Sequence, residues 1–480
     1  MSPIRSAARR STAPVATLLG VFALLLSSAA PAASAPGPGN IDDGRSGSIT
    51  IHKFAEPEGG GTAHNGQKLD PTTTAGLTPL QGVEFSITNL GLDLDTAEGW
   101  RAAEALRDDD ILKVVDKVGR DSSLARTEAI TGALGSVETN LPLGLYLVEE
   151  ITSGSHRVVA PVDPFLVSLP TAVDDRWLYN VHAYPKNSVV TLGMSVQEDK
   201  AFGLGDVVTW EIDASIPRLP AERSFTGFSL SVAVDPRLSL TSKDEVVLSL
   251  VDGDEVPREA YELLHDPENG TLTIKPHPEA LSYLREFQGH SVRLTVPTSV
   301  TSNTNGEGVI KNTATMTVNG NTVAPATAST SWGAVKVVTR AGGGGLAGAQ
   351  YQVRRGSDNG EIITVAGQDT FTSDSNGEVI IPGLRAGGDY VLVETKAPQG
   401  YTAMSESRSV KVVAADVEQV KRAQSAHSNV ITIDKEQVSG FVLPSTGSFG
   451  SLPFLLAGLL LVATALVVNR RRRRRLAQAV

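Results

Sequence analysis

The sequence predicts a mainly β protein with three β-sandwich domains in series, and three observations favour this class. The composition is rich in turn formers, with 46 Gly and 26 Pro but only 4 Met, which is not typical of a helical chain. Short segments alternate apolar and polar residues, as half-buried strands do, and turns such as Asp252-Gly253 and Asn269-Gly270 separate them. The length of 480 residues suggests about three domains of roughly 150 residues each.

The charge and the absence of cysteine exclude several kinds of site. The chain has 42 Lys and Arg against 53 Asp and Glu, a net charge of −11, and nucleic-acid binding requires a basic surface instead. Without cysteine it forms no disulfide, no Cys-ligated zinc site and no thiol nucleophile. The eight His show no metal-ligand spacing, and no Ser/His/Asp motif is present. We therefore expect no metal, no cofactor and no enzyme.

The two ends of the chain have the composition of export and membrane signals. A basic start, an apolar stretch and an Ala-rich segment predict a signal peptide over residues 1–32, followed by a linker over 33–46. Near the other end, a charge-free apolar run over 452–468 is just long enough to span a bilayer. The arginines that follow it, residues 470–475, hold that end in the cytoplasm.

Between these ends the alternating segments fall into three groups. We expect a first domain over 47–186, a middle domain over 187–331 and a last domain over 332–440. The first also contains one helical pattern, near residues 96–115, with Asp95 at the N-cap position. Its buried face is expected to carry Trp100, Ala103, Leu106 and Leu112.

A pentapeptide stands shortly before the C-terminal apolar run. It reads Leu443-Pro444-Ser445-Thr446-Gly447. Together with the span and the arginine tail, it resembles the sorting signal of Gram-positive surface proteins, and this whole segment covers 441–480. The resemblance implies that a sortase cysteine attacks the Thr446 carbonyl, releases Gly447 onward and holds the rest as a thioester until an amine resolves it. It also implies an exported protein that the membrane retains before sorting anchors it covalently to the cell wall.

A second motif ends the first domain. Its residues are Trp177, Val181, Tyr184, Pro185 and Lys186. Taken alone, Lys186 is a solvated surface lysine, because Lys is rarely buried. The motif resembles the pilin motif of sortase-assembled major pilins, although Ala183 departs from the usual valine. The resemblance implies that the Lys186 amine attacks the thioester on Thr446 of another copy, which forms an amide between subunits.

A third motif surrounds Glu394. Tyr390, Leu392 and Glu394 share one strand face, where a carboxylate is costly unless it is paired or protonated. With residues 398–401, this segment resembles the E-box of collagen-adhesin B-type pilin domains. The resemblance implies Ig-like or prealbumin-like sandwiches in which such a glutamate joins a buried lysine to an asparagine. The product is an autocatalytic intramolecular isopeptide bond, and ammonia is lost.

The first domain offers a complete set of residues for such a bond. By strand alternation, Lys53 lies on the inward face of the opening strand, and Glu150 lies on the inward face of a second E-box-like strand. Asn187 has the inward parity of the pilin-motif strand, provided that the strand continues past Pro185. Asn180 is the alternative acceptor, but its parity is wrong.

The middle domain lacks part of this set. Asn312 has the parity of an acceptor, yet Met194 stands where a lysine is required, and Lys200 lies well beyond it. The inward row that would supply an acid is apolar. The sequence therefore predicts that this domain has lost the bond and replaced it with apolar packing.

The last domain keeps the glutamate but shifts its partners. Thr339 occupies the inward row of the opening strand, whereas Lys336 has the opposite parity, which only a bulge would correct. The acceptor is either Asn429, which is in phase, or Asp434, which is not. Lys336, Glu394 and Asn429 are the residues expected here.

Together these resemblances predict a structural subunit of a covalently polymerised pilus shaft, a fimbrium on a Gram-positive cell surface. The partners they imply are a pilin-specific and a housekeeping sortase, other copies of the chain, tip or base pilins, peptidoglycan and a host receptor. The alternative is a monomeric wall-anchored adhesin that binds a host ligand. The sorting signal fits both functions, and only the pilin motif at Lys186 separates them.

Overall fold

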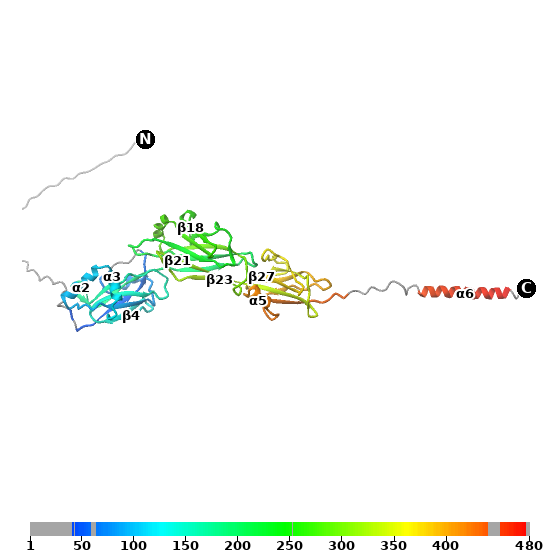
Figure 1. Cartoon of the computed structure of the whole chain (residues 1–480), viewed down its shortest axis with the longest axis horizontal. Helices are drawn as coiled ribbons and strands as arrows, with labels where there is room; N and C mark the ends of the chain where they lie inside the picture. Colours follow the sequence, from blue (N-terminus) through cyan, green and yellow to red (C-terminus); the bar gives the residue numbers. More distant parts are fainter. Residues whose placement is uncertain (1–40, 43, 59–63, 252, 440–451, 477–480) are drawn as a thin grey trace, which may run out of the picture. The chain divides into compact units, whose positions relative to one another are not determined.

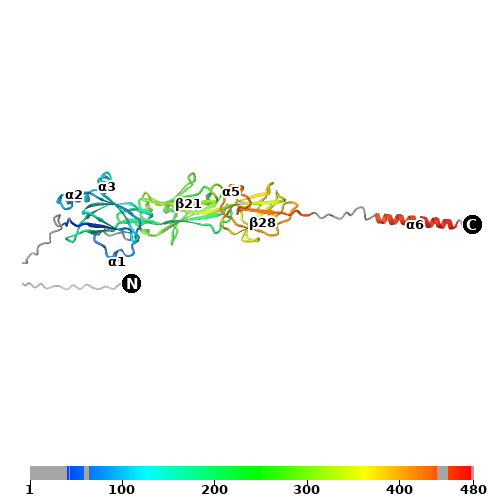
Figure 2. The ribbon, with the colours of Figure 1, turned by 90° about the horizontal axis from the view of Figure 1, so that it is seen from below.

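The computed structural model describes residues 41–476 except 43, 59–63, 252 and 440–451, and it is mainly β. The chain divides into two compact units, Met1–Val190 with Pro217–Ser224, and Thr191–Ile216 with Phe225–Val480. Figure 1 and Figure 2 show the strands of each unit. The predicted signal peptide and the pentapeptide 443–447 lie outside the described residues.

The first unit is a β-sandwich. A sheet in the order β4-β3-β6-β8 and a sheet in the order β11-β1-β5 share one core, to which Ile51, Phe85 and Val148 belong. A third sheet has the order β2-β12-β7. Its strands β2 and β12 follow β1 and β11 closely in the chain. The strands are β1 Gly47–His52, β2 Phe54–Ala55, β3 Glu84–Asn89, β4 Arg126–Ile130, β5 Ser136–Leu141, β6 Gly144–Thr152, β7 Val158–Ala160, β8 Phe165–Leu169, β9 Thr171–Val173, β10 Arg176–Leu178, β11 Asn180–Ala183 and β12 Lys186–Val189.

Two helices replace the single helix that the pattern predicts. They are α2, Ala97–Asp108, and α3, Ile111–Gly119, besides the short α1, Pro71–Thr74. The chain breaks before α3 because the Asp110 side chain caps the new helix. Thr96, not Asp95, caps α2, and its hydroxyl accepts from Gly99 N–H at 3.0 Å. The break also changes the helical phase, so Leu112 is 65% exposed and the prediction that it is buried is wrong.

These helices lie against one face of the β4-β3-β6-β8 sheet. Alternation along β6 explains the arrangement, since Leu145 and Leu147 pack with residues of α2 and α3, whereas Tyr146 and Val148 face the sandwich core. Glu150 continues the inward row of Tyr146 and Val148.

The second unit contains two groups of strands that one long strand connects. The first half of β23, Ala326–Ala341, pairs with β21, and its second half pairs with β27 and β30. The expected boundary at 331/332 falls inside this strand. The other strands are β13 Leu192–Gln197, β14 Val207–Ser215, β15 Phe228–Ala233, β16 Leu238–Leu240, β17 Val247–Leu250, β18 Tyr261–Asp266, β19 Thr271–Pro276, β20 Ser291–Val300, β21 Val309–Val318, β22 Asn321–Thr322, β24 Gly344–Gly345, β25 Gln350–Arg355, β26 Phe371–Thr372, β27 Glu378–Arg385, β28 Tyr390–Lys396, β29 Arg408–Val410 and β30 Val430–Asp434.

The helices of the second unit are short, apart from the last. They are α4 Pro278–Leu281, α5 Val417–Arg422 and the 3-10 helices η2 Arg258–Ala260 and η3 Tyr283–Phe287. The last helix, α6, covers Leu452–Leu476. Its stretch Leu452–Arg474 is long and apolar enough to cross a membrane, with a mean hydropathy of 2.3 in its most apolar window. This stretch contains the predicted span 452–468.

Candidate functional site

Lys53, Glu150 and Asn187 form a buried cluster in the first unit. The Lys53 Nζ lies 2.9 Å from Glu150 Oε2 and 2.5 Å from Asn187 Oδ1. The Asn187 Nδ2 donates to Glu150 Oε1 at 2.7 Å. The side chains of Lys53 and Glu150 are 0% and 3% exposed, and Asn187 is fully buried. An amine, a carboxamide and a carboxyl group thus touch one another away from solvent.

Strand register explains how these three residues meet. Lys53 lies between β1 and β2, and β2 pairs in parallel with β12 so that Lys186 is opposite Phe54. Asn187 is the next residue of β12 and points to the opposite face from Lys186. The strand is interrupted at Tyr184 and Pro185, but the inward parity of Asn187 survives. Asn180 is exposed and accepts from Ser48 Oγ instead.

The surroundings make the Lys53 amine easier to deprotonate than an exposed lysine. Burial lowers the pKa of Lys53 from its usual 10.5 to about 8, although the neighbouring Glu150 carboxylate opposes this shift. The Ser153 hydroxyl donates to Glu150 Oε1 at 2.5 Å, and the Val162 N–H donates to Asn187 Oδ1 at 2.8 Å. A neutral amine is a nucleophile, so the cluster is equipped for attack on the carboxamide.

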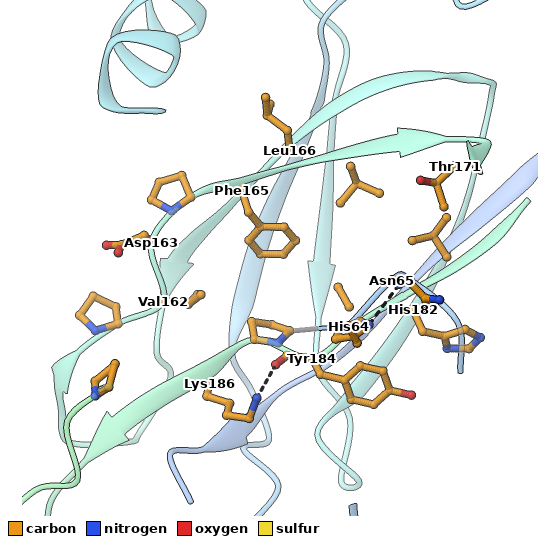
Figure 3. Close-up of a pocket in the computed structure, with 18 of the residues that line it drawn as sticks. His64, Asn65, Val162, Asp163, Phe165, Leu166, Thr171, His182, Tyr184 and Lys186 are labelled. Carbon is orange, nitrogen blue, oxygen red and sulfur yellow. Dashed lines mark hydrogen bonds between the residues drawn. The ribbon is translucent and has the colours of Figure 1, made fainter. Parts of the chain in front are cut away.

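Lys186 lies on the other face of the same strand. It is half-buried, and its Nζ donates to the Tyr184 carbonyl at 3.4 Å (Figure 3). It lines a cavity of about 820 Å³ together with Tyr184 and Arg223. The remaining wall is mixed, with prolines and aliphatic residues beside the charged residues Glu56, Asp163 and Glu222. The Lys186 amine therefore faces a space that an uncharged peptide segment with polar and apolar groups can enter.

The other pilin-motif residues are packed into the first unit, and Val181, Tyr184 and Pro185 also line the cavity. Tyr184 is buried, its hydroxyl accepts from Leu69 N–H at 2.9 Å, and its ring stacks on His52 at a centroid distance of 4.6 Å. Burial lowers the pKa of His52 to about 4, so this imidazole is neutral at pH 7. Val181 belongs to the sandwich core, and Trp177 packs on Trp100 of α2 at 5.4 Å between ring centroids.

The second unit holds Glu394, but its partner is not the predicted lysine. Glu394 Oε2 lies 2.5 Å from the Nζ of Lys435, and the two side chains are 1% and 2% exposed. The same oxygen accepts from Met404 N–H at 2.6 Å, and Lys435 also donates to the Thr402 carbonyl at 3.2 Å. Lys435 follows β30 and shares the inward parity of Ile433, a signal that the sequence already contains.

The structure does not bring Lys336 and Asn429 to Glu394, so that predicted grouping is wrong. Lys336 has the opposite parity, and β23 carries its bulge before this residue, between Gly333 and Val335. The Lys336 Nζ instead donates to the Lys421 carbonyl at 3.0 Å. The Asn429 amide nitrogen donates to the Ala334 and Val413 carbonyls at 2.9 and 2.8 Å. Thr339 shares a hydrogen bond of 2.7 Å with the Tyr351 hydroxyl.

Asn312 also lies where alternation predicts, fully buried on β21. Its Oδ1 accepts from Asp235 N–H at 2.8 Å, and its Nδ2 has no hydrogen-bond partner among the described residues. The neighbouring inward row carries Leu230 and Val232, both buried. The described part of the chain also contains no group of three or more His, Asp or Glu that could hold a metal ion.

Known protein families and fimbrial subunits match this chain along much of its length. Residues 44–188 match the N-terminal D1 domain of Gram-positive pilin subunits, 334–425 match a prealbumin-like fold domain, and 435–475 match the LPXTG cell wall anchor motif. The fimbrial subunit type 1 of Actinomyces viscosus is 29% identical over 96% of both chains. The fimbrial subunit type 2 of Actinomyces naeslundii is 28% identical over 94% of this chain and 95% of its own.

The chain contains Gram-positive pilin domains and an LPXTG anchor, and it is similar to fimbrial subunits over nearly its whole length. These findings support a structural subunit of a cell-wall-anchored surface pilus, not an enzyme. The fold agrees with this assignment, since the full-length major pilin SpaD of Corynebacterium diphtheriae aligns with a TM-score of 0.62 at 24% identity, over 84% of this pilin and 100% of that chain. The major pilin SpaA of the same organism aligns with a TM-score of 0.55 at 20% identity, over 81% of this pilin and 99% of that chain.

Proposed function

We propose that this pilin is a shaft subunit and that a sortase joins its Thr446 carbonyl to the Lys186 amine of another copy. The sortase cysteine holds Thr446 as a thioester after Gly447 leaves. Lys186 attacks the thioester carbon, an amide forms, and the cysteine leaves as a thiol. When the amine comes from the wall precursor instead, the same thioester anchors the pilus to peptidoglycan.

The cavity beside Lys186 is the observation that carries this proposal. Its wall combines prolines and aliphatic residues with polar side chains, which suits the segment Leu443-Pro444-Ser445-Thr446 with its apolar and hydroxyl side chains. A donor segment in the cavity would hold the Thr446 carbonyl near the amine, which converts a bimolecular attack into a nearly intramolecular one.

The test is the Lys186→Arg variant in the native host. We expect the ladder of detergent-resistant, high-mass polymers to disappear, because the guanidinium is not a nucleophile at cellular pH. Lys68→Arg is the matched control, since Lys68 is an exposed lysine of the same unit, and it should leave the ladder intact. A normal ladder from Lys186→Arg would instead favour the alternative, a monomeric wall-anchored adhesin.

We also propose that Lys53 and Asn187 form an intramolecular isopeptide bond, with Glu150 as the acid. Both reacting side chains are buried and in contact, and burial lowers the pKa of the Lys53 amine. Each bond removes one ammonia, or about 17 Da. Intact-mass measurement of the mature chain should therefore show one such loss, and Glu150→Gln should show none. A wild-type mass without any loss would reject this bond.

A further inference from the structure

The carboxamide of Asn187 is held in one orientation. Val162 N–H is a donor and contacts the amide oxygen at 2.8 Å, whereas Glu150 Oε1 lies 2.7 Å from the amide nitrogen. A reversed amide would set two N–H groups against each other and an oxygen against the carboxylate. The contacts therefore direct the nitrogen, the future leaving group, toward the acid and the oxygen toward the main chain.

This orientation matters for the cross-linking step proposed above. When the neutral Lys53 amine adds to Asn187 Cγ, the C=O π electrons move onto Oδ1, which becomes an oxyanion. Glu150 then gives its proton to Nδ2 and takes one from Nζ, so the C–N bond to Nδ2 breaks and ammonia leaves. The negative charge exists only in the intermediate, and a donor aimed at Oδ1 stabilises it more than the starting amide.

We propose that the main-chain N–H of Val162 is the oxyanion donor for the bond between Lys53 and Asn187. This inference rests on that bond. The N–H is within hydrogen-bond distance of the reacting oxygen before the reaction begins, so the donor requires no reorganisation. It is a backbone group, which is why a search for chemically active side chains in the sequence does not find it.

The local chain fixes this N–H in place. β7 pairs with β12 so that Ala160 is opposite Ser188, the residue after Asn187. The chain leaves β7 at Ala160 and therefore passes beside Asn187 two residues later. Pro161 and Pro164 restrict the backbone on both sides of Val162. Asp163 also forms an ion pair of 2.6 Å with Arg223, which connects this segment to residues 217–224 of the same unit.

The experiment compares variants at Val162 in the full mature chain. Val162→Pro deletes the N–H, and Val162→Ala keeps it while shortening the side chain. Intact mass is recorded at intervals after a short pulse of synthesis, and the growth of the species lighter by about 17 Da gives the rate. We expect Val162→Ala to react at nearly the wild-type rate and Val162→Pro to react about 10²- to 10³-fold more slowly.

A second variant shows whether a slow reaction of Val162→Pro comes from the lost N–H or from misfolding. The α-hydroxy acid analogue of valine at position 162 replaces the N–H with an oxygen and leaves the side chain unchanged. It should show the same slow reaction while melting like the unlinked Glu150→Gln variant. If this analogue forms the bond at the wild-type rate, Val162 is not the donor. If the wild-type chain itself never loses about 17 Da, both the bond and the donor are rejected.

Discussion

Glu150 and Glu394 each contact a buried lysine, but the two lysines follow different strands: Lys53 follows the first strand of the described chain and Lys435 follows the last. Lys53 follows the opening strand β1, and the Asn187 carboxamide lies 2.5 Å from its amine. Lys435 follows β30, and its amine donates to Glu394 and to a main-chain carbonyl. A carboxylate is a poor electrophile, so the second pair stays ionic. If the proposed link forms, the difference indicates that an E-box glutamate supports it only where a carboxamide completes the set, as Asn187 does beside Glu150.

Removal of Lys53 should give the largest loss of stability of the variants considered. Lys53→Ala eliminates the proposed cross-link and leaves a cavity where the buried lysine side chain packed. Loss of a cross-link costs about 2–5 kcal/mol by analogy with disulfides, and truncation of a large buried side chain to alanine costs about 2–5 kcal/mol. We therefore expect the free energy of unfolding of the first unit to fall by at least about 4 kcal/mol.

Calorimetry of the full mature chain measures this effect as a shift of one unfolding transition. Lys68→Ala is the matched control, because that lysine is exposed and should change stability by about 0.5 kcal/mol or less. A fall below about 2 kcal/mol in Lys53→Ala would show that neither the link nor the packing of the Lys53 side chain stabilises the unit.

The corresponding change in the second unit should be smaller. Lys435→Ala leaves Glu394 buried without its cation but breaks no covalent bond, so we expect a loss of about 3–5 kcal/mol. The control is Arg340→Ala, which breaks a neighbouring pair with Asp434 whose side chains are 46% and 73% exposed, and which should cost under about 1 kcal/mol. Equal effects of the two variants in chemical unfolding would contradict the importance of burial.

The sequence predicts the first cluster well because a strand has a strict period of two. Lys53, Glu150 and Asn187 can be placed by counting, and the interruption at Pro185 does not change the parity. In the second unit the same counting excludes Lys336. Lys435 also has the inward parity, but it follows the last strand, whereas the prediction places the lysine on the opening strand. The contact between Lys435 and Glu394 depends on where the two strands end, which alternation does not specify.

Other features depend on contacts that no local pattern encodes. The helical pattern near 96–115 is correct as helix, but the break before Asp110 is not visible in the spacing of apolar residues. The break follows from Asp110, whose side chain accepts from Leu112 N–H and caps the next helix. The Val162 N–H contact is beyond sequence reasoning for a different reason, since every residue except proline has such a group.

The two clusters should also differ in their response to pH. In Asn187→Ala, Lys53 stays an amine with a pKa lowered to about 8 by burial, against roughly 10.4 in the unfolded chain. A lowered lysine pKa destabilises the charged, folded form, so the free energy of unfolding is least below pH 8. It should rise by up to about 3 kcal/mol between pH 8 and 10.4. If Lys53 and Asn187 are linked as proposed, the wild type should lack this rise, because its Lys53 is then an amide.

Denaturant unfolding of both proteins across this range gives the comparison, and the difference between them cancels the other groups that titrate there. Glu150→Gln is an additional control, since it keeps Lys53 as an amine but removes the carboxylate that opposes the shift. Its gain above pH 8 should be at least as large. Parallel curves for wild type and Asn187→Ala would mean that Lys53 is not linked in the wild type.

The smallest expected effect concerns the unused acceptor Asn312. Asn312→Leu removes one hydrogen bond from Asp235 N–H, but it also removes an Nδ2 without a partner among the described residues. These terms oppose each other, so stability should change by about 1 kcal/mol or less. Asn429→Leu is the contrast, because it deletes contacts to Ala334 and Val413 and should cost about 2–4 kcal/mol. No lysine or acid side chain of the described residues forms a hydrogen bond with Asn312, so its amide can contribute to stability only through its hydrogen bonds to the main chain. A large loss of stability in Asn312→Leu would therefore mean that these hydrogen bonds hold the middle strands together.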